Sequence, residues 1–442
     1  MATTENGGSA LQRLLAKTSD IKPEETRTTL ASFSLVLMLM ASYYILKPVR
    51  DSMASDWTDA EVSWLWTATF FISFIAVSIH GVIVTKVAFR RLVPTIYTFF
   101  AASFVLFFIA TQSISERTLV DKSFYVWISL FSLFHISVFW SFMADTFTKQ
   151  QSKRLFAFIG AGASVGGLLG PTLTAGFAQQ LGTDYLLLVA AVLIVLTLPV
   201  ILWIQRLKVT DLHNSGSLVG PDQLNAIGGN PLSGFSEFFK SKYLIGIGLF
   251  IFLYTSIGSF VYFELKNLLA DYDRETRSQI WAGMDLAVNS MTLVVAFFVT
   301  GRVANHLGLS FTLALVPVLI GGGLLLLAAT PIVSVVVGIQ VARRIGNYAM
   351  TRPAREMLFT AVDRETRFKA KQVVDIVIYR GGDMLNAWAF TLLTTGFGLG
   401  LAAVAVVGAG IAAVWALLGI YLGRQFRDMG PVDDAEGEQQ PA

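Results

Sequence analysis

The chain has 442 residues, of which 54% are hydrophobic and only 14% charged, and its formal net charge at pH 7 is +3. Soluble globular proteins carry about 25% charged residues, so the composition excludes an ordinary soluble protein and predicts apolar side chains that face lipid. The sequence contains no cysteine, and its four histidines show no metal-ligand spacing. It therefore predicts no thiolate site, no iron–sulfur cluster, no bound metal and no cofactor.

Long apolar runs, taken from the N-terminus onward, predict twelve membrane-spanning helices. Each run has about 20 residues, which is enough to cross ~30 Å of hydrocarbon. We expect the spans at 28–48, 64–86, 93–112, 124–146, 157–180, 184–207, 243–265, 279–303, 309–330, 332–352, 371–396 and 399–423. The predicted fold class is an all-α polytopic membrane protein with two six-helix bundles.

A segment rich in glycine, asparagine, serine and proline separates the sixth span from the seventh and predicts a linker. The first residues lack the short apolar core and cleavage site of a signal peptide, so the first span is expected to be uncleaved. The expected organisation is an N-terminal segment (1–27), an N-terminal bundle (28–207), the linker (208–242), a C-terminal bundle (243–423) and a tail (424–442).

Lysine and arginine residues are distributed unequally between the two sides of the predicted membrane. With the N-terminus inside, 23 of them fall in cytoplasmic segments and five in outer loops. The positive-inside rule then places both termini in the cytoplasm. We expect a monomeric, multi-pass protein of a bacterial inner membrane, in contact with lipid and without a nucleic-acid partner.

Two stretches of the second half repeat stretches of the first. Lys153 to Gly166, which enters span five, has the spacing of Lys369 to Gly382, which enters span eleven. Residues 43–47, near the end of span one, resemble residues 262–266 near the end of span seven. Together with the six-plus-six counting, these repeats point to a two-bundle transporter of the major-facilitator type.

Charged residues inside the predicted spans need a reason, because a charge near the bilayer centre costs ~2.5–3.5 kcal/mol. At about 1.5 Å per residue, Arg343 and Arg344 lie ~18 Å from the outer side and Arg380 lies ~12 Å from the inner side. These arginines therefore come to nearly the same height. Adjacent helical residues point about 100° apart, so at most one of Arg343 and Arg344 faces the centre, and the sequence leaves open which one.

The candidate site residues are charged or titratable groups in or near the spans. The candidates for substrate binding are Lys47, Arg50, Glu264, Arg343, Arg344 and Arg380. The candidates for coupling or gating are Asp51, His135, Asp285 and Asp383. Guanidinium groups grip phosphate or carboxylate in bidentate geometry, which favours a small anionic substrate. The alternative is that opposite charges pair and hold the helices together, and for Arg380 the partner would be Asp383, three residues on.

Two further features have a structural and a functional interpretation. Gly162, Gly166 and Gly170 recur every fourth residue in span five, which favours close helix packing over a substrate contact. His135 lies near the middle of span four, where it could titrate near neutral pH or serve as a hydrogen-bonded structural residue.

Several stretches resemble the ATP/ADP antiporter family, the nucleotide transporters of plastids and intracellular bacteria. They are residues 46–51, 139–142, 263–266, 283–285, 352–358, 369–371, Asp375 and 380–382. The resemblance implies a major-facilitator-like fold and places the charged residues that the family uses in nucleotide exchange on Arg50, Glu264 and Arg380. Two family lysines are replaced by arginine here, and the family's span-four glutamate falls near Ile128, which carries no acid.

The sequence thus predicts a secondary transporter that moves an anionic metabolite, with ATP/ADP-type nucleotide exchange as one form, by alternating access. The alternative is a proton-coupled transporter of another organic anion or a drug-like molecule, with Asp285, Asp383, Glu264 or His135 as the titrating group. A membrane enzyme would need paired acids or histidines with metal-ligand spacing near one interface. Neither these nor a Walker loop occurs in the sequence, so no enzyme is expected.

Overall fold

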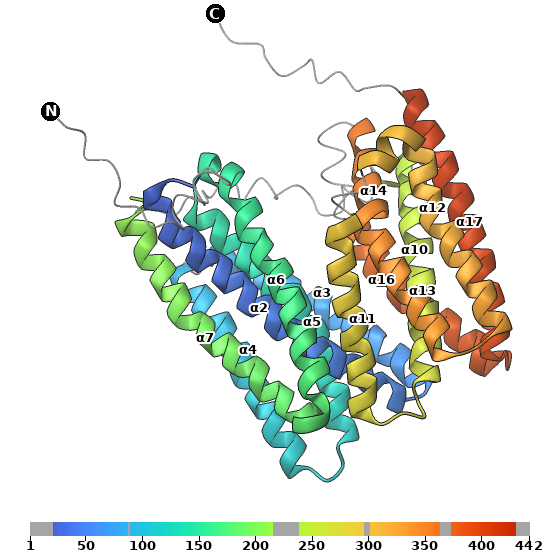
Figure 1. Ribbon diagram of the computed structural model, residues 1–442, viewed down its shortest axis with the longest axis horizontal. Coiled ribbons are helices and arrows are strands. Elements are labelled where there is room, and N and C mark those ends of the chain that lie inside the picture. The colour runs from blue at the N-terminus through green and yellow to red at the C-terminus, as the bar shows by residue number, and fades with distance from the viewer. Residues whose placement is uncertain (1–20, 87–88, 215–237, 296–300, 363–372, 430–442) are drawn as a thin grey trace, which may run out of the picture. The chain divides into compact units, whose positions relative to one another are not determined.

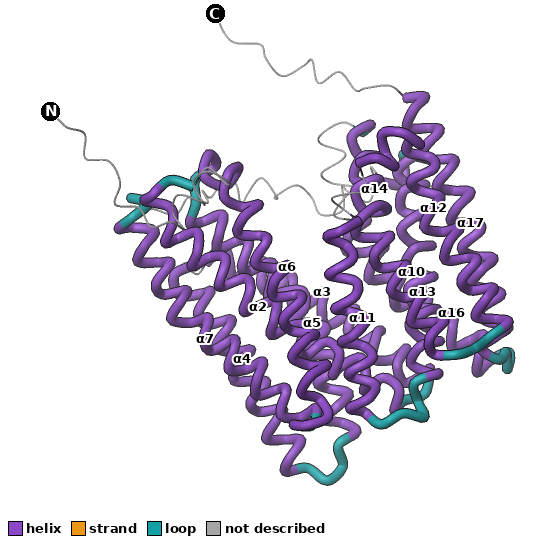
Figure 2. Tube along the Cα trace, in the orientation of Figure 1, coloured by secondary structure: helices purple, strands orange, loops and turns teal. Residues whose placement is uncertain are grey.

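A computed structural model describes residues 21–86, 89–214, 238–295, 301–362 and 373–429 (Figure 1). Within these ranges every regular element is a helix, and Figure 2 shows helices joined by short loops. The predicted all-α fold class is confirmed. Helices are the expected outcome for apolar runs of this length, because hydrocarbon offers no hydrogen-bond partner and each span must satisfy its own backbone.

The first half of the chain supplies six long helices. They are α2 (Thr26–Met53), α3 (Asp59–Lys86), α4 (Phe89–Ser113), α5 (Thr118–Thr146), α6 (Lys149–Leu181) and α7 (Thr183–Thr210). Each contains one of the first six predicted spans or most of it.

The second half is less regular. Its helices are α10 (Lys242–Leu268), α11 (Arg274–Val295), α12 (Gly301–Ala329), α13 (Val333–Gly346), α14 (Arg352–Leu358), α16 (Tyr379–Thr391) and α17 (Leu401–Met429). A π-helical stretch, Asn347–Thr351, joins α13 to α14, and two more, Val373–Ile378 and Leu392–Gly396, flank α16.

Nine of the described helices are long and apolar enough to cross a membrane. The other three expected spans coincide with α11, with α13 continued into α14, and with α16 and its flanking π-helical stretches. These three segments carry candidate charged residues or are interrupted by π-helical turns. Length and hydropathy alone therefore do not select them.

Contacts group the chain into two compact units. One contains Met1–Met53, Phe71–Ile227 and Arg274–Leu286; the other contains Ala54–Phe70, Gly228–Asp273 and Ala287–Ala442. The grouping departs from the expected bundles at two helices, since α3 and α11 each contribute residues to both units. The bundle boundaries 28–207 and 243–423 therefore stay a prediction.

The internal repeat has a structural counterpart in each unit. A Cβ atom on Gly162 or Gly170 of α6 would lie 2.5 or 2.6 Å from a carbonyl oxygen of α2, and one on Gly166 would clash with the carbonyl oxygen of Leu37. The close packing predicted for this glycine stripe is confirmed. In the second half, a Cβ atom on Gly382 of α16 would lie 2.5 Å from the Thr255 hydroxyl oxygen of α10. The matching glycines Gly166 and Gly382 thus both lie at a helix contact, against backbone in the first half and against a side chain in the second.

Some predicted features lie outside the described residues. These are residues 1–20 of the N-terminal segment, 215–237 of the linker, 430–442 of the tail, and the stretch 369–371 that contributed to the family resemblance.

Candidate functional site

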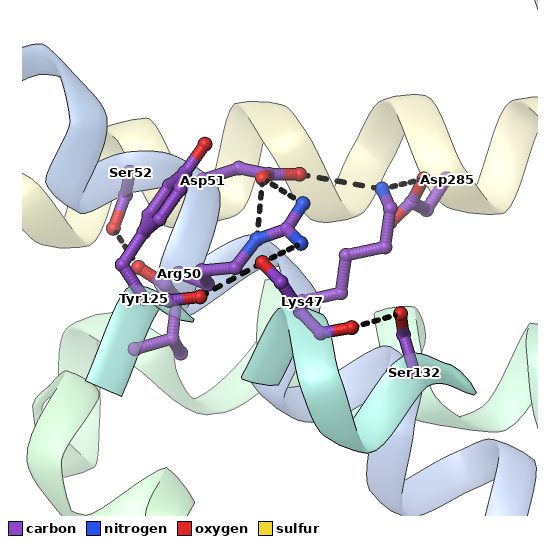
Figure 3. Close-up of polar contacts among 9 residues, drawn as sticks. Lys47, Arg50, Asp51, Ser52, Tyr125, Ser132 and Asp285 are labelled. Atoms are coloured by element: carbon purple, nitrogen blue, oxygen red, sulfur yellow. Dashed lines mark hydrogen bonds and ion pairs between the residues drawn. The ribbon is translucent and has the colours of Figure 1, made fainter. Parts of the chain in front are cut away.

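Lys47, Arg50 and Asp51 form a charged cluster at the C-terminal end of α2 (Figure 3). Lys47 Nζ lies 2.8 Å from both carboxylate oxygens of Asp285 on α11 and 3.4 Å from Asp51. Both acids are buried, with side chains 0% and 2% exposed. Lys47 therefore bridges two acids from two helices.

Arg50 is also held on the acids of this cluster. Its Nε donates to Asp51 at 3.0 Å, its Nη1 donates to the Ser129 hydroxyl at 3.1 Å, and its guanidinium lies 5.2 Å from the centroid of the Tyr125 ring. Two cations and two acids balance here, so four of the sequence-predicted residues form a neutral network that joins α2, α5 and α11.

Further polar contacts fix the start of α11 on the same unit. Ser278 donates to the Ser52 hydroxyl at 2.9 Å, Arg277 donates to the Ser52 carbonyl oxygen at 3.3 Å, and Arg274 Nη2 donates to Asp121 at 2.8 Å. A cavity of about 390 Å³ lies beside the last of these pairs and is lined by Gln112, Arg117, Asp121, Leu181, Gly182, Thr183, Asp184, Tyr185, Arg274 and Glu275. None of the ten predicted site residues lines it.

A second ion pair, between Lys266 of α10 and Asp59 of α3, lies in the other unit. Lys266 is 1% exposed, and its Nζ lies 2.8 Å from Asp59 Oδ1. It also donates to the Trp57 carbonyl oxygen at 3.0 Å and to the Asn267 side-chain oxygen at 2.7 Å. Asp59 receives two more hydrogen bonds, from Asn267 at 3.1 Å and from the Thr394 hydroxyl at 2.9 Å.

Glu264 lies one helical turn before Asn267 on α10 and is 1% exposed. Neither of its carboxyl oxygens has a hydrogen-bond partner within the described part of the chain. Glu264 ends a predicted span, and its side chain is buried in the structure.

Arg343 is the arginine of its pair that lies against α10. Its guanidinium is 5.4 Å from the centroid of the Tyr254 ring, and its Nη1 would lie only 3.0 Å from a Cβ atom on Gly258. It is 8% exposed. Its Nε donates to Gln340 at 3.0 Å, and no ion pair to Arg343 occurs among the described residues. Tyr379 of α16 extends the aromatic wall, with its ring centroid 6.1 Å from that of Tyr254.

Arg380 and Asp383 lie on α16 close to this wall. The charges of Arg380 and Arg343 both act on the Asp383 carboxyl, but Arg380 and Asp383 do not form an ion pair in the described structure. Helical spacing allows such a pair without requiring it. Counted together, Arg343, Arg380 and Asp383 carry one excess positive charge. Arg344 is also buried, at 7% exposure.

His135 is packed among aromatic side chains. Its ring stacks on Tyr43 at 4.7 Å, and its Nδ1 lies 3.1 Å from the Phe131 carbonyl oxygen. Its Nε2 is buried with no partner among the described residues. This environment suits a neutral ring with a structural role.

The structure adds two residues that the sequence reasoning missed. Asp59 lies before the expected start of the second span and was counted with the loop, and Tyr254 was one aromatic residue among many. A signal for Asp59 existed in the repeat, because Lys47 and Lys266 occupy matching positions and a partner for one implies a partner for the other. Among the described residues, no three histidine or acidic side chains are arranged to hold a metal.

The sequence model of the Major Facilitator Superfamily matches residues 32–354. No curated protein matches the chain. Solved structures show the same fold at low sequence identity. A POT family transporter in complex with a thioalcohol-conjugated peptide has a TM-score of 0.65 at 12% identity, covering 92% of this chain and 99% of that one.

Two further structures are similar. The nucleoside transporter NupG has a TM-score of 0.62 at 14% identity, covering 91% of this chain and 99% of that one. A bacterial homologue of the human lysosomal transporter Spinster, inward-facing and unoccupied, has a TM-score of 0.60 at 12% identity, covering 94% and 100%. At these identities the likeness concerns the fold alone.

Proposed function

The chain belongs to the Major Facilitator Superfamily, and from this premise we propose that it is a secondary transporter whose substrate is a small anionic metabolite. Membership of this family makes it an integral, multi-pass membrane transporter and not an enzyme. The proposal concerns the charge of the substrate, and it depends on the second half of the chain.

The observation that carries the proposal is the excess positive charge around Arg343, Arg380 and Asp383. A buried charge requires a partner or water, because removing it from water is costly. Within the described residues Arg343 has only an amide oxygen and an aromatic ring as partners, and Arg380 has no ion pair. An incoming carboxylate or phosphate would supply the missing negative charge and could accept two parallel hydrogen bonds from one guanidinium.

Lys47, Arg50, Asp51 and Asp285 support a different role. Their charges balance and their hydrogen bonds are made within the protein, so an anion would have to displace Asp51 or Asp285. We propose that they hold α2 against α11 and change partners during alternating access, and that Arg343 and Arg380 bind the substrate.

A nucleotide is the first anion to test, because the family resemblance carries the exchange residues over to Arg50, Glu264 and Arg380. One position speaks against the full ATP/ADP pattern. Ile128, near which that family has an acid, is an apolar residue and is 0% exposed. Arginine also grips phosphate differently from the lysines it replaces.

A thermal-shift screen of the purified protein tests the proposal, since a ligand that binds only the folded state raises apparent stability. The panel should contain ATP, ADP, sugar phosphates, organic acids and uncharged nucleosides. We expect at least one anion to stabilise the wild type and to lose its effect in Arg343→Ala. Stabilisation by nucleosides alone, equal in both proteins, would contradict an anionic substrate.

We also propose that both termini lie in the cytoplasm of a bacterial inner membrane and that the protein functions as a monomer. The absence of cysteine makes the topology easy to measure, because any introduced cysteine is unique. Ser9→Cys should be protected from a membrane-impermeant maleimide in intact cells, whereas Ser115→Cys in the α4–α5 loop should be labelled. The reverse pattern would invert the topology.

A further inference from the structure

Glu264 is a buried acid that receives no hydrogen bond from any described residue. It is 1% exposed, and both carboxyl oxygens lack a hydrogen-bond partner in the described part of the chain. An isolated ionised carboxylate is so costly to bury that such a group takes up a proton instead. The environment therefore favours a neutral carboxylic acid at this position.

The neighbouring acid, Asp59, differs from Glu264 because it has several hydrogen-bond donors. It accepts hydrogen bonds from the Lys266 ammonium, the Asn267 amide and the Thr394 hydroxyl, at 2.8, 3.1 and 2.9 Å. Asp59 thus has three donors from α10 and from the stretch that follows α16. Its negative charge acts on Glu264 and opposes a second negative charge there.

Lys266 cannot neutralise Glu264 in this arrangement. An ammonium group has three N–H donors, and those of Lys266 are directed to Asp59, the Trp57 carbonyl and Asn267. Residues two apart on a helix also do not face each other, so the Lys266 side chain leaves α10 in a different direction.

The other charged groups near α10 act elsewhere. Glu61 of α3 acts on Lys266, and α13 and α16 contribute Arg343, Arg380 and Asp383, which act on one another. Among the described charged groups, the charge that acts on Glu264 is therefore that of Asp59.

We propose that Glu264 is the proton-binding site of the transport cycle, carrying a proton in this conformation and releasing it when Asp59 and Lys266 separate. Separation removes the opposing charge of Asp59 and admits water to the carboxyl group, and both changes favour the ionised form. Breaking the ion pair would then be linked to proton release. The inference concerns the coupling ion and holds whichever anion is carried.

Infrared difference spectroscopy of the purified full-length protein, stepped from acidic to alkaline pH, tests the site without any substrate. We expect the wild type to show, at neutral pH, the carbonyl stretch of a protonated carboxylic acid. Glu264→Gln should fold, because glutamine mimics the neutral acid, and its spectrum should lack this band. Retention of the full band in Glu264→Gln would overturn the proposal.

Glu25 provides a matched control. It is as buried as Glu264, at 2% exposure, but Arg154 grips both of its oxygens at 2.8 and 3.2 Å. Glu25→Gln should leave the carboxylic acid band unchanged, because a carboxylate held by arginine is ionised. Loss of the band in Glu25→Gln, with retention in Glu264→Gln, would show that the protonated acid is Glu25 and would refute the inference.

Asp59→Asn tests the linkage between the two acids. Removing the negative charge and freeing Lys266 should make Glu264 easier to ionise, so its band should disappear at lower pH than in the wild type. Should Asp59→Asn fail to fold, Thr394→Val removes one donor to Asp59 and should shift the titration of the same band by a smaller amount. An unchanged titration in the variant that folds would show that Asp59 does not control the proton.

Discussion

Lys47 and Lys266 occupy matching positions in the two halves of the chain, and each pairs with an aspartate from the other half. Lys47 ends the first span and pairs with Asp285 of α11, the second helix of the second half; Lys266 ends the seventh span and pairs with Asp59 of α3, the second helix of the first half. In the register of the repeat, Asp285 matches Trp66 and Asp59 matches Ser278. The repeat preserves the lysine and the helix that carries its partner. The acid itself is shifted, because Asp285 lies about two helical turns after the position in α11 that matches Asp59.

The differences between the halves are more informative than the likeness. Glu264 matches Ile45, and Arg380 matches Ser164. The first half folds with an apolar residue, Ile45, and a small polar residue, Ser164, at these positions. The charges at the matching positions of the second half are therefore not required for packing. We infer that the shared features build the scaffold, and that the features found in one half serve binding and coupling.

The largest expected effect comes from removing one lysine of the two ion pairs. Lys47→Met should cost about 3 kcal/mol of unfolding free energy, because it removes the ammonium group that lies 2.8 Å from both carboxylate oxygens of buried Asp285. Lys266→Met should cost less, since Asn267 and Thr394 still donate to Asp59. Thermal unfolding in detergent measures both. The double variant Lys47→Met with Asp285→Asn should recover part of the lost unfolding free energy. Equal losses in Lys47→Met and Lys266→Met would contradict the expected difference between the two ion pairs.

Substitution of the matching glycines compares the two helix contacts. Gly166→Ala should destabilise by about 1–3 kcal/mol, because the added methyl meets the backbone of α2, which cannot rotate away. Gly382→Ala meets the Thr255 hydroxyl, a side-chain atom that can move, and should cost less. Gly176→Ala is the control, with nothing within 4 Å of the added methyl. The same unfolding assay should rank the three variants in that order.

Arg380 has no charged counterpart in the first half, so its replacement should affect binding more than stability. Arg380→Ala should weaken the binding of the anion that stabilises the wild type by about 10- to 100-fold, and Arg380→Lys should retain part of the affinity. Asp383→Asn should leave binding largely intact. Titration calorimetry with that anion measures the affinities. Wild-type affinity in Arg380→Ala would end the substrate-site proposal; loss of stability in both Arg380→Ala and Asp383→Asn would indicate a structural pair.

Glu264→Gln should have the smallest effect on the fold, within about 0.5 kcal/mol of wild type, because the buried acid is replaced by a neutral isostere. Proteoliposomes loaded with the unlabelled anion that stabilises the protein should still take up the labelled anion by exchange at equal pH. Uptake driven by a pH gradient into vesicles without internal anion should be lost. Aggregation of this variant on size-exclusion chromatography would favour a structural role for Glu264. Unchanged gradient-driven accumulation would separate Glu264 from coupling.

Hydropathy was sufficient to predict the nine described helices that are long and apolar enough to cross a membrane, because such a helix is specified by its own apolar length. It could not predict ion-pair partners: Lys47 and Asp285 are 238 residues apart, and a sum of charges does not say which of them meet. Asp59 was missed because it precedes the apolar run that defines its span. The choice of Arg343 over Arg344 as the residue facing α10 depends on the rotation of α13 against Tyr254, which adjacent positions in a sequence do not encode.

The three π-helical stretches near the basic residues affect how this chain can be aligned with its relatives. A π-helical turn contains roughly one residue more than an α-helical turn, so residues after it are rotated by about 100° from the phase that an uninterrupted α-helix would give them. Arg380 is the second residue after Val373–Ile378, and Arg355 is the fourth residue after Asn347–Thr351. A relative without the extra residue would present the same face one position earlier. Matching its basic residues to Arg380 therefore requires a one-residue gap, placed within the π-helical stretch.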